Sequence, residues 1–348
     1  YFGATVGCLI MFLIWLLMTY STLAVAEACL HFEVGISYLG LAHKLFKKQG
    51  IIIVYICSFG ILYGMLTAYI SAIGASFESI LNINHTAIEI GFIVLFGGFI
   101  LKGTSYAEWL NRLFLSVKLI IILFVILLLL KTINIEHLKL YSFSNLTQLA
   151  ITLPILATTF SAHIIIPTVV SYVGHYPKDI KRIIITSSIL ILIIYTLWIV
   201  VIFGNIAVYG DNSSFSYILE HLKEEDSVTQ LIYILKTNIN SHNVITLIYT
   251  FITISVTTAF ITLSLALKDL ITDKFKMKSL SIISRNLVLI FLLFLLPILL
   301  NYYFKNLFLI ALSVVGLFSL IMLVSCPLNM VRIIRNKNYK MLLISMQK

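Results

Sequence analysis

The stretch Leu153-Pro154-Ile155-Leu156-Ala157-Thr158-Thr159-Phe160-Ser161-Ala162-His163-Ile164-Ile165-Ile166-Pro167 is a long apolar run that contains residues able to interrupt a helix. Pro167 has no N–H, and its ring clashes with the carbonyl of His163, so helical hydrogen bonding is weakest just before it. Inside a membrane, an interrupted helix persists only where it lines a cavity or is buried in protein. The stretch therefore predicts a broken helix around residues 158–167, with a binding site beside it.

The residue types at this break indicate what such a site would bind. Small and hydroxylated side chains tolerate irregular backbone there. Free N–H groups of the second half-helix bind a carboxylate, and freed carbonyl groups of the first half bind an ammonium. An amino acid carries both groups. The alternative is a proline kink without a ligand, in which a histidine hydrogen-bonded between helices would be purely structural. The candidate substrate-binding residues of this segment are Thr159, Phe160, Ser161, Ala162 and His163.

The rest of the chain has the composition of a polytopic membrane protein. Of its 348 residues, 60% are hydrophobic and 11% are charged, and the mean hydropathy is +1.06. Soluble domains carry about a quarter charged residues. A membrane-spanning helix needs roughly 20 apolar residues, and most of the apolar runs approach or exceed that length. We therefore predict nine transmembrane helices, near residues 4–29, 51–76, 86–101, 113–130, 149–172, 183–209, 244–267, 287–300 and 308–331.

The charged residues lie mainly in the loops and predict the orientation of the helices. The net charge of +10 would suit a nucleic-acid partner. However, the basic residues gather at alternate helix ends, which is the pattern of cytoplasmic loops, so no nucleic acid is expected. With nine helices, Tyr1 would lie outside, and we expect a preceding helix that enters from the cytoplasm. The loops expected in the cytoplasm are those near residues 44–48, 102–112, 178–182, 268–285 and 332–340.

Motifs spread along the whole chain carry a resemblance to a known family. The main one runs from Leu153-Pro154 through Phe160, His163 and Pro167 to Val170-Ser171-Tyr172. Others are Glu27-Ala28-Cys29-Leu30-His31-Phe32 with Val34-Gly35, Ala68-Tyr69-Ile70-Ser71-Ala72 with Gly74, Lys118, Gly204-Asn205-Ile206 and Asp269-Leu270-Ile271-Thr272-Asp273. With these motifs the chain resembles the tyrosine and tryptophan permeases of the hydroxy/aromatic amino acid permease family, within the amino acid–polyamine–organocation superfamily. It departs from the family pattern at Ile164 and Ile165, where a Gly and a small polar residue are usual.

The resemblance implies an all-α inverted-repeat fold, similar to leucine transporters, in a single transmembrane transporter domain over residues 1–348. Against that template the chain runs from helix 2 to helix 10, with helices 1 and 11 missing. Residues 1–131 would be the remainder of the first repeat and residues 149–331 the second repeat. The resemblance also implies proton-coupled import of an aromatic amino acid across the bacterial inner membrane, with tyrosine expected first and tryptophan next. The expected partners are the amino acid, protons and the lipid bilayer, and no cofactor is expected.

Lys118 is the expected proton-coupling residue, with Glu27 as a second candidate. Lys118 follows Arg112 by six residues, about 9 Å of helix, and is then surrounded by apolar residues. Burial favours the neutral form of an amine, so such a lysine is able to gain and lose a proton during transport. The alternative is a lysine whose charged end reaches the cytoplasmic interface. Glu27 is either a buried partner of Lys118, a member of another polar network, or a carboxylate that faces water.

Polar residues on two other predicted helices are further candidates for the substrate site, although such residues more often serve in helix packing. The alternatives to an aromatic amino acid transporter are a permease for another small amino acid, an inactive truncated remnant, and an integral-membrane enzyme. The enzyme is disfavoured because the sequence has no paired acids, H-E-x-x-H motif or phosphate-binding glycine loop. The four cysteines lack metal-ligand spacing, so no metal site is predicted. The additional substrate candidates are Tyr69, Ser71, Ser255 and Thr258.

Overall fold

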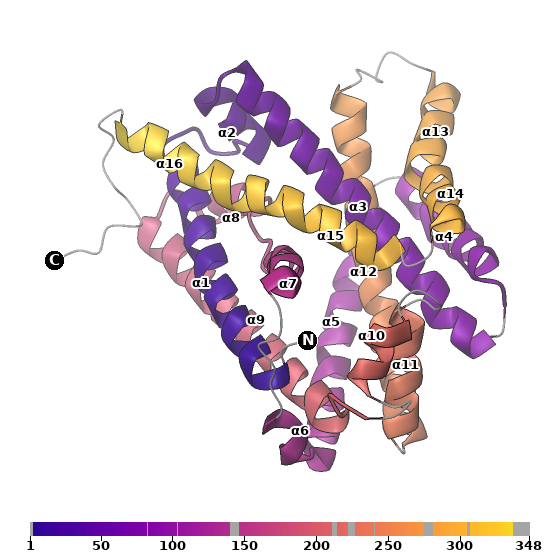
Figure 1. Ribbon diagram of the computed structural model, residues 1–348. Helices are drawn as coiled ribbons and strands as arrows, with labels where there is room; N and C mark the ends of the chain where they lie inside the picture. Colours follow the sequence, from indigo (N-terminus) through magenta and orange to yellow (C-terminus); the bar gives the residue numbers. More distant parts are fainter. Residues whose placement is uncertain are drawn as a thin grey trace. The chain divides into compact units, whose positions relative to one another are not determined.

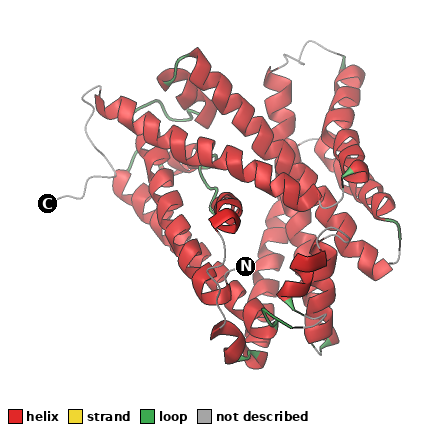
Figure 2. Cartoon of the chain, viewed as in Figure 1, coloured by secondary structure: helices red, strands yellow, loops and turns green. Residues whose placement is uncertain are grey.

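The regular structure of the chain is helical. The computed structural model describes residues 3–81, 83–102, 104–139, 146–210, 214–221, 227–239, 241–274, 281–304 and 307–336, and no strand occurs among them (Figure 2). Seven helical segments are long and apolar enough to cross a membrane, and His85–Gly98 is a shorter apolar helix. These findings confirm a polytopic, all-helical membrane protein. The count of nine helices and the inverted repeat stay predictions.

Each predicted apolar run corresponds to one helix or to a consecutive pair (Figure 1). Six runs are continuous helices, and the runs near residues 149–172, 287–300 and 308–331 are each divided in two. Parts of the loops expected in the cytoplasm, at residues 103, 275–280 and 337–340, lie outside the described residues, as do residues 222–226 of a loop expected outside. The helices are α1 Gly3–Cys29, α2 Tyr38–Leu45, α3 Lys48–Leu81, α4 His85–Lys102, α5 Thr104–Leu129, α6 Ile135–Lys139, α7 Leu146–Thr159, α8 Ile166–Val173, α9 Pro177–Asn205, α10 Phe215–His221, α11 Ser227–Asn238, α12 His242–Lys274, α13 Ile282–Ile290, α14 Leu296–Tyr303, α15 Leu307–Ser319 and α16 Cys326–Asn336.

Each of the three apolar runs that are divided into two helices is divided beside a proline. A π-helical segment, Phe291–Leu295, separates α13 from α14 and ends just before Pro297. A second one, Leu320–Ser325, separates α15 from α16 and ends just before Pro327. A proline removes one backbone donor and clashes with the carbonyl four residues earlier, and a wider π turn accommodates both effects. The third division, before Pro167, breaks the helix outright.

The chain divides into two compact units, and three of the four boundaries between them fall within α3, α9 and α15. The first unit comprises residues 1–61, 142–197 and 313–348. Within it, α1 packs against α7, α8 and α16. Glycines allow close approach here: a Cβ on Gly60 would lie 2.4 Å from the ring of Phe318, and one on Gly316 would lie 2.6 Å from Cβ of Pro154. Small residues at helix contacts are the usual means of close packing in membranes.

The second unit comprises residues 62–141 and 198–312 and holds two apolar clusters. In one of them, the ring of Phe260 on α12 contacts those of Phe92 on α4 and Phe294 in the π-helical segment, with centroids 5.0 Å and 5.9 Å away. The other is formed mainly by Val, Ile and Leu side chains of α5, α9, α11 and α12. These clusters place polar residues of α3, α4, α5 and α12 inside an otherwise apolar unit.

Candidate functional site

The helix predicted over residues 149–172 is interrupted where Pro167 indicated. Helix α7 ends at Thr159, turns and irregular backbone cover residues 160–165, and α8 begins at Ile166. Pro167 lies in the first turn of α8, where a missing N–H leaves no helical hydrogen bond unmade. The proline therefore starts the second half-helix, and the backbone between the two halves is irregular.

Hydroxyl groups cover part of the carbonyl end of α7. The hydroxyls of Thr158 and Thr159 donate to the carbonyls of Ile155 and Leu156, both at 2.6 Å, and that of Ser161 donates to the carbonyl of Thr158 at 2.7 Å. Such local bonds are typical of Ser and Thr near helix ends. The expected freed carbonyls are therefore partly occupied, and an ammonium would have to use their second lone pairs or the hydroxyl oxygens.

A cavity of about 230 Å³ lies beside this break, within the first unit. Ligand pockets commonly enclose about 300–1,000 Å³, so this one suits a single small molecule. Its wall is mixed, with hydroxyl groups from α1 and α9 and apolar side chains from α8 and α9. Four of the predicted residues, Thr159 to Ala162, line it. The full lining is Thr19, Thr22, Thr159, Phe160, Ser161, Ala162, Ile166, Ile184, Ser187, Ser188 and Ile191.

His163 is fully buried and does not line this cavity. Its Nε2 lies 3.4 Å from the hydroxyl oxygen of Thr22, and Nδ1 has no hydrogen-bond partner among the described residues. Thr22 also donates to the carbonyl of Met18, at 2.8 Å, and itself lines the cavity. His163 is thus linked to the cavity wall through Thr22, one residue removed from the space that a ligand would occupy.

The remaining predicted substrate residues belong to the second unit, where Tyr69 and Thr258 line a different cavity of about 280 Å³ together with Lys118. The ammonium of Lys118 lies 3.4 Å from the hydroxyl oxygen of Thr258. Ser71 and Ser255 do not line this cavity. Ser71 is buried, and the Ser255 hydroxyl is buried without a hydrogen-bond partner in the described part of the chain. The predicted residues therefore form two groups, one in each unit.

Glu27 is a member of a polar network within the first unit. Its side chain is fully buried, and both carboxylate oxygens accept hydrogen bonds from Arg335 of α16, at 3.2–3.3 Å. The Glu27 backbone carbonyl lies 2.7 Å from Nδ1 of His31. Of the roles that the sequence left open for Glu27, this geometry favours a buried network and disfavours a carboxylate that faces water.

Sequence reasoning missed the cavity residues of α1 and α9. Thr19 and Thr22 are three residues apart on an apolar helix, which places them on the same face. Ser187 and Ser188 are adjacent hydroxyls at the start of a long apolar run. Polar residues at helical spacing in an apolar span were the available signal, but only packing shows that these two pairs face the break in residues 160–165.

Comparisons with known proteins identify the family of the chain. A sequence model of the tryptophan/tyrosine permease family matches residues 1–344. The chain is 25% identical to the tyrosine-specific transport system 1 of Haemophilus influenzae, over 91% of this chain and 78% of that relative. It is 26% identical to the tryptophan-specific transport protein of Shigella flexneri, over 75% of this chain and 63% of that relative. It is also 24% identical to glutamine transporter 2 of Aliivibrio fischeri, over 97% and 83% of the two chains. Because the family model spans nearly the entire sequence, the chain belongs to the tryptophan/tyrosine permease family.

Proposed function

We propose that this protein is a secondary active transporter that imports an aromatic amino acid, together with protons, across the bacterial inner membrane. The observation that carries the proposal is the cavity at the broken helix, in a chain of this permease family. Broken helices in transporters commonly form substrate sites, because their free backbone groups and dipoles interact with charged substrate groups. The transporter domain is proposed to include both units and to contain two repeats, within residues 1–131 and 149–331.

The cavity offers separate surfaces for the two ends of an amino acid. The backbone and hydroxyls near Thr159 and Ser161 suit the ammonium and carboxylate groups. Phe160, Ile184 and Ile191 form an apolar wall for the side chain. The ring of Phe160 also contacts that of Tyr195, with centroids 5.7 Å apart, which holds the phenyl group in place. Aromatic pairs of this kind contribute roughly 0.5–1.5 kcal/mol beyond burial.

Tyrosine is the first expected substrate, tryptophan the second, and glutamine or another small amino acid the alternative. Relatives named for tyrosine, tryptophan and glutamine transport have nearly equal identity to this chain. The hydroxyls of Ser187 and Ser188 favour a substrate whose side chain has a polar end. A phenol meets both requirements, since its ring would contact the apolar wall and its hydroxyl would reach the serines.

Uptake by purified protein in liposomes, with an imposed pH gradient, tests the proposal. Radiolabelled tyrosine should accumulate, and unlabelled tryptophan should compete better than glutamine. In the variant Ser161→Phe the added ring would fill the cavity, so saturable uptake should be lost. Thr186→Phe is the matched control, because Thr186 is exposed on α9 and lies outside the cavity lining. Unchanged substrate affinity in Ser161→Phe would place the binding site elsewhere.

We also propose that Lys118 gains and loses a proton during transport. Its ammonium is half-buried in a cavity of the second unit, beside the neutral hydroxyl of Thr258. A buried amine without a carboxylate partner is less costly when neutral, so it exchanges protons more readily than an exposed lysine. Glu27 is proposed to stabilise the contact between α1 and α16 through its ion pair with Arg335.

A further inference from the structure

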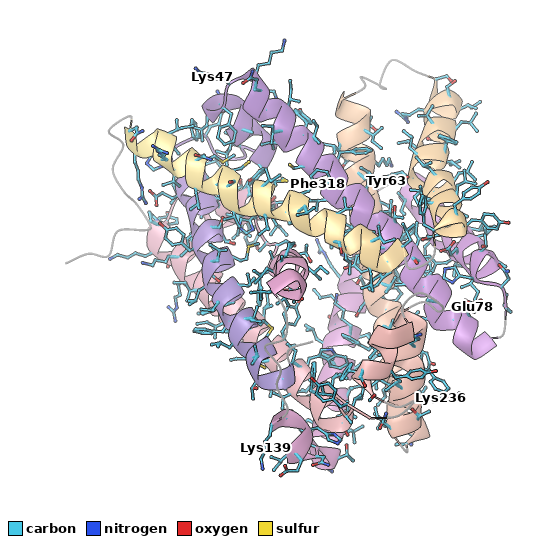
Figure 3. All side chains as sticks on the ribbon, in the orientation of Figure 1. Lys47, Tyr63, Glu78, Lys139, Lys236 and Phe318 are labelled. Carbon is cyan, nitrogen blue, oxygen red and sulfur yellow. The ribbon has the colours of Figure 1, made fainter. Side chains whose placement is uncertain are left out.

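Glu78, His85 and Glu89 form a chain of titratable groups in the second unit, at one end of α3 and α4. Nδ1 of His85 lies 3.2 Å from Oε2 of Glu78, and its Nε2 lies 3.2 Å from Oε1 of Glu89. The exposed fraction of the side chain falls from 46% at Glu78 to 25% at His85 and 0% at Glu89. Figure 3 labels Glu78 near the end of α3. The three groups thus lead from the surface to a buried carboxyl group.

The two contacts of the His85 ring require a shared proton. A neutral imidazole has one N–H, so it is able to donate to only one of two carboxylates. Favourable contacts on both ring nitrogens need either an imidazolium ion, or a neutral ring with one glutamate protonated. Either state holds one proton more than a neutral ring between two carboxylates. This geometry therefore suits the proton-loaded form of the cluster, and loss of that proton would leave one contact without a hydrogen.

The buried end of the cluster suits a group that changes its protonation state. Oε2 of Glu89 has no hydrogen-bond partner within normal limits among the described residues, nor do Oδ1 and Nδ2 of Asn301 on α14. The Asn301 side chain lies close enough to interact with Glu89. An amide is able to donate to a carboxylate or, after rotation, accept from a protonated carboxyl group. Asn301 can therefore serve both protonation states of Glu89.

Gly74 provides the space that the imidazole occupies. A Cβ at this position of α3 would lie 2.5 Å from Nε2 and 2.7 Å from Cδ2 of His85, closer than real Cβ contacts allow. The ring therefore lies directly against the backbone of α3, between the two glutamates. Any larger residue at position 74 would displace the ring.

The surroundings favour a proton over a metal ion as the ligand. Glu78 and Glu89 contact opposite nitrogens of one ring, so their carboxylates do not converge on a common point. No group of three or more His, Cys, Asp or Glu side chains in the described part of the chain is placed to hold a metal ion. Helices α5, α12 and α14 pack against α4. Among the described residues, the groups that act on Glu89 from any helix are His85, Glu78 and the Asn301 amide.

We propose that Glu78, His85 and Glu89 are a proton-binding site at the outer end of α3 and α4, through which a proton from outside enters the second unit. The outer placement follows from the basic residues Lys47 and Lys48 at the opposite end of α3, which the charge pattern places in the cytoplasm. This inference deepens the proposed function and rests on its proton coupling, but assigns the uptake of the proton to residues other than Lys118.

The proposed step conserves protons. In the unloaded state the ring is neutral and both glutamates are carboxylates. One proton from the outer solution reaches the ring through Glu78 and forms the imidazolium ion. The ring then passes the proton on Nε2 to Oε1 of Glu89, and keeps its Nδ1–H toward Glu78. Glu89 becomes a neutral carboxyl group, and Glu78 remains charged. No bond other than N–H and O–H bonds forms or breaks.

The first experiment measures the proton directly, without transport. Purified native protein and the variant Glu89→Gln are titrated in detergent between about pH 8 and pH 5, the range in which a histidine–carboxylate cluster exchanges protons. Both proteins should take up a proton in this range, because His85 and Glu78 are present in both. Only the native protein should show the band of a protonated, buried carboxyl group in infrared difference spectra, since the variant lacks Glu89. Glu136→Gln is the matched control, because Glu136 is exposed and ion-paired with Lys139. Absence of the carboxyl band from the native protein, or its persistence in Glu89→Gln, would overturn the proposal.

The second experiment tests coupling in liposomes. Glu89→Gln should lose at least tenfold in accumulation driven by an imposed pH gradient, while exchange of labelled for unlabelled substrate persists. Gly74→Ala should shift the dependence of uptake on outer pH, because it displaces the His85 ring. Gly91→Ala on α4 should behave as native, since a Cβ there meets no atom within 4 Å. Native pH dependence in Glu89→Gln also contradicts the proposal. By contrast, failure of the native protein to transport any amino acid would contradict the proposed function and leave the titration to decide on the proton site.

Discussion

Two charged residues on transmembrane helices have opposite surroundings. Lys118 lies beside a neutral hydroxyl in a cavity, and no carboxylate forms an ion pair with it among the described residues. Glu27 lies in a buried ion pair with Arg335. A charge inside a membrane protein either pairs with an opposite charge or marks a functional pathway. The surroundings of Lys118 favour proton exchange, and those of Glu27 favour a fixed contact between helices.

Replacement of Lys118 should separate proton coupling from substrate binding. Lys118→Ala should lose accumulation driven by a pH gradient while substrate exchange persists. Lys118→Arg should lose accumulation as well, because a guanidinium does not release its proton. Uptake and exchange assays in liposomes measure both activities, with Lys131→Arg as an exposed control. If Lys118→Arg accumulates substrate with native pH dependence, the lysine is an anchor at the cytoplasmic interface.

Removal of either partner from the Glu27–Arg335 pair should destabilise the protein unequally. Arg335→Ala leaves the carboxylate of Glu27 buried and unpaired, which costs about 3 kcal/mol or more for a buried pair. Glu27→Gln leaves an arginine that is 27% exposed and can still reach water, so it should cost less. Thermal unfolding in detergent should give the order native and Arg332→Ala, then Glu27→Gln, then Arg335→Ala. A midpoint for Arg335→Ala equal to that of the exposed control Arg332→Ala would mean that the pair contributes nothing.

At the scale of helices, Pro167 decides where in the sequence the helix breaks, and the packing of α7 decides where that break lies in space. Pro154 of α7 lies against Gly316 of α15, within the first unit, and this contact leaves no room for a side chain at position 316. Thr159 and Ser161 follow directly at the end of α7. Displacement of α7 would therefore move the cavity wall as well as weaken the packing.

Gly316→Ala should reduce both stability and uptake. Its Cβ would lie 2.7 Å from the carbonyl carbon of Pro154, and backbone yields less readily than a flexible side chain. Overpacking of this kind costs roughly 1–3 kcal/mol. The thermal unfolding midpoint and the substrate affinity should both fall, whereas Gly91→Ala, which meets no neighbour, should change neither. Native affinity in a destabilised Gly316→Ala would show that the cavity is independent of this contact.

At the scale of the whole molecule, the charge pattern predicts the orientation in the membrane. Lys47 precedes α3 and Lys139 ends α6, and both are labelled in Figure 3. Loops with an excess of Lys and Arg stay in the cytoplasm. The loop around Lys47 is richer in basic residues than the loop around Lys139, so the first should lie inside and the second outside.

Cysteine labelling tests this orientation. In a background without Cys8, Cys29, Cys57 and Cys326, an impermeant thiol reagent added to intact cells should label Lys139→Cys. Lys47→Cys should react only after the membrane is opened. Both side chains are exposed, so access depends on the side of the membrane. Labelling of Lys47→Cys in intact cells would reverse the orientation and place the Glu78–His85–Glu89 cluster in the cytoplasm.

The sequence alone determined the class of the protein and most of its helices. Long apolar runs cannot be buried within a soluble domain, and a proline weakens helical hydrogen bonding at a known position, so both features can be read from the local sequence. The break before Pro167 and four residues of the adjoining cavity, Thr159 to Ala162, were predicted for this reason. The orientation predicted from loop charge also rests on a local property, and it stays a prediction.

Only the tertiary structure decided which distant residues meet. Glu27 and Arg335 are 308 positions apart, and nothing in either segment specifies the pairing. Thr22 reaches His163, and Gly74 makes room for His85, because helices pack through shapes that apolar periodicity does not encode. Within a membrane, helix contacts depend on small residues and close packing rather than on exclusion of water, so an apolar sequence specifies that a helix spans but not which helix it contacts.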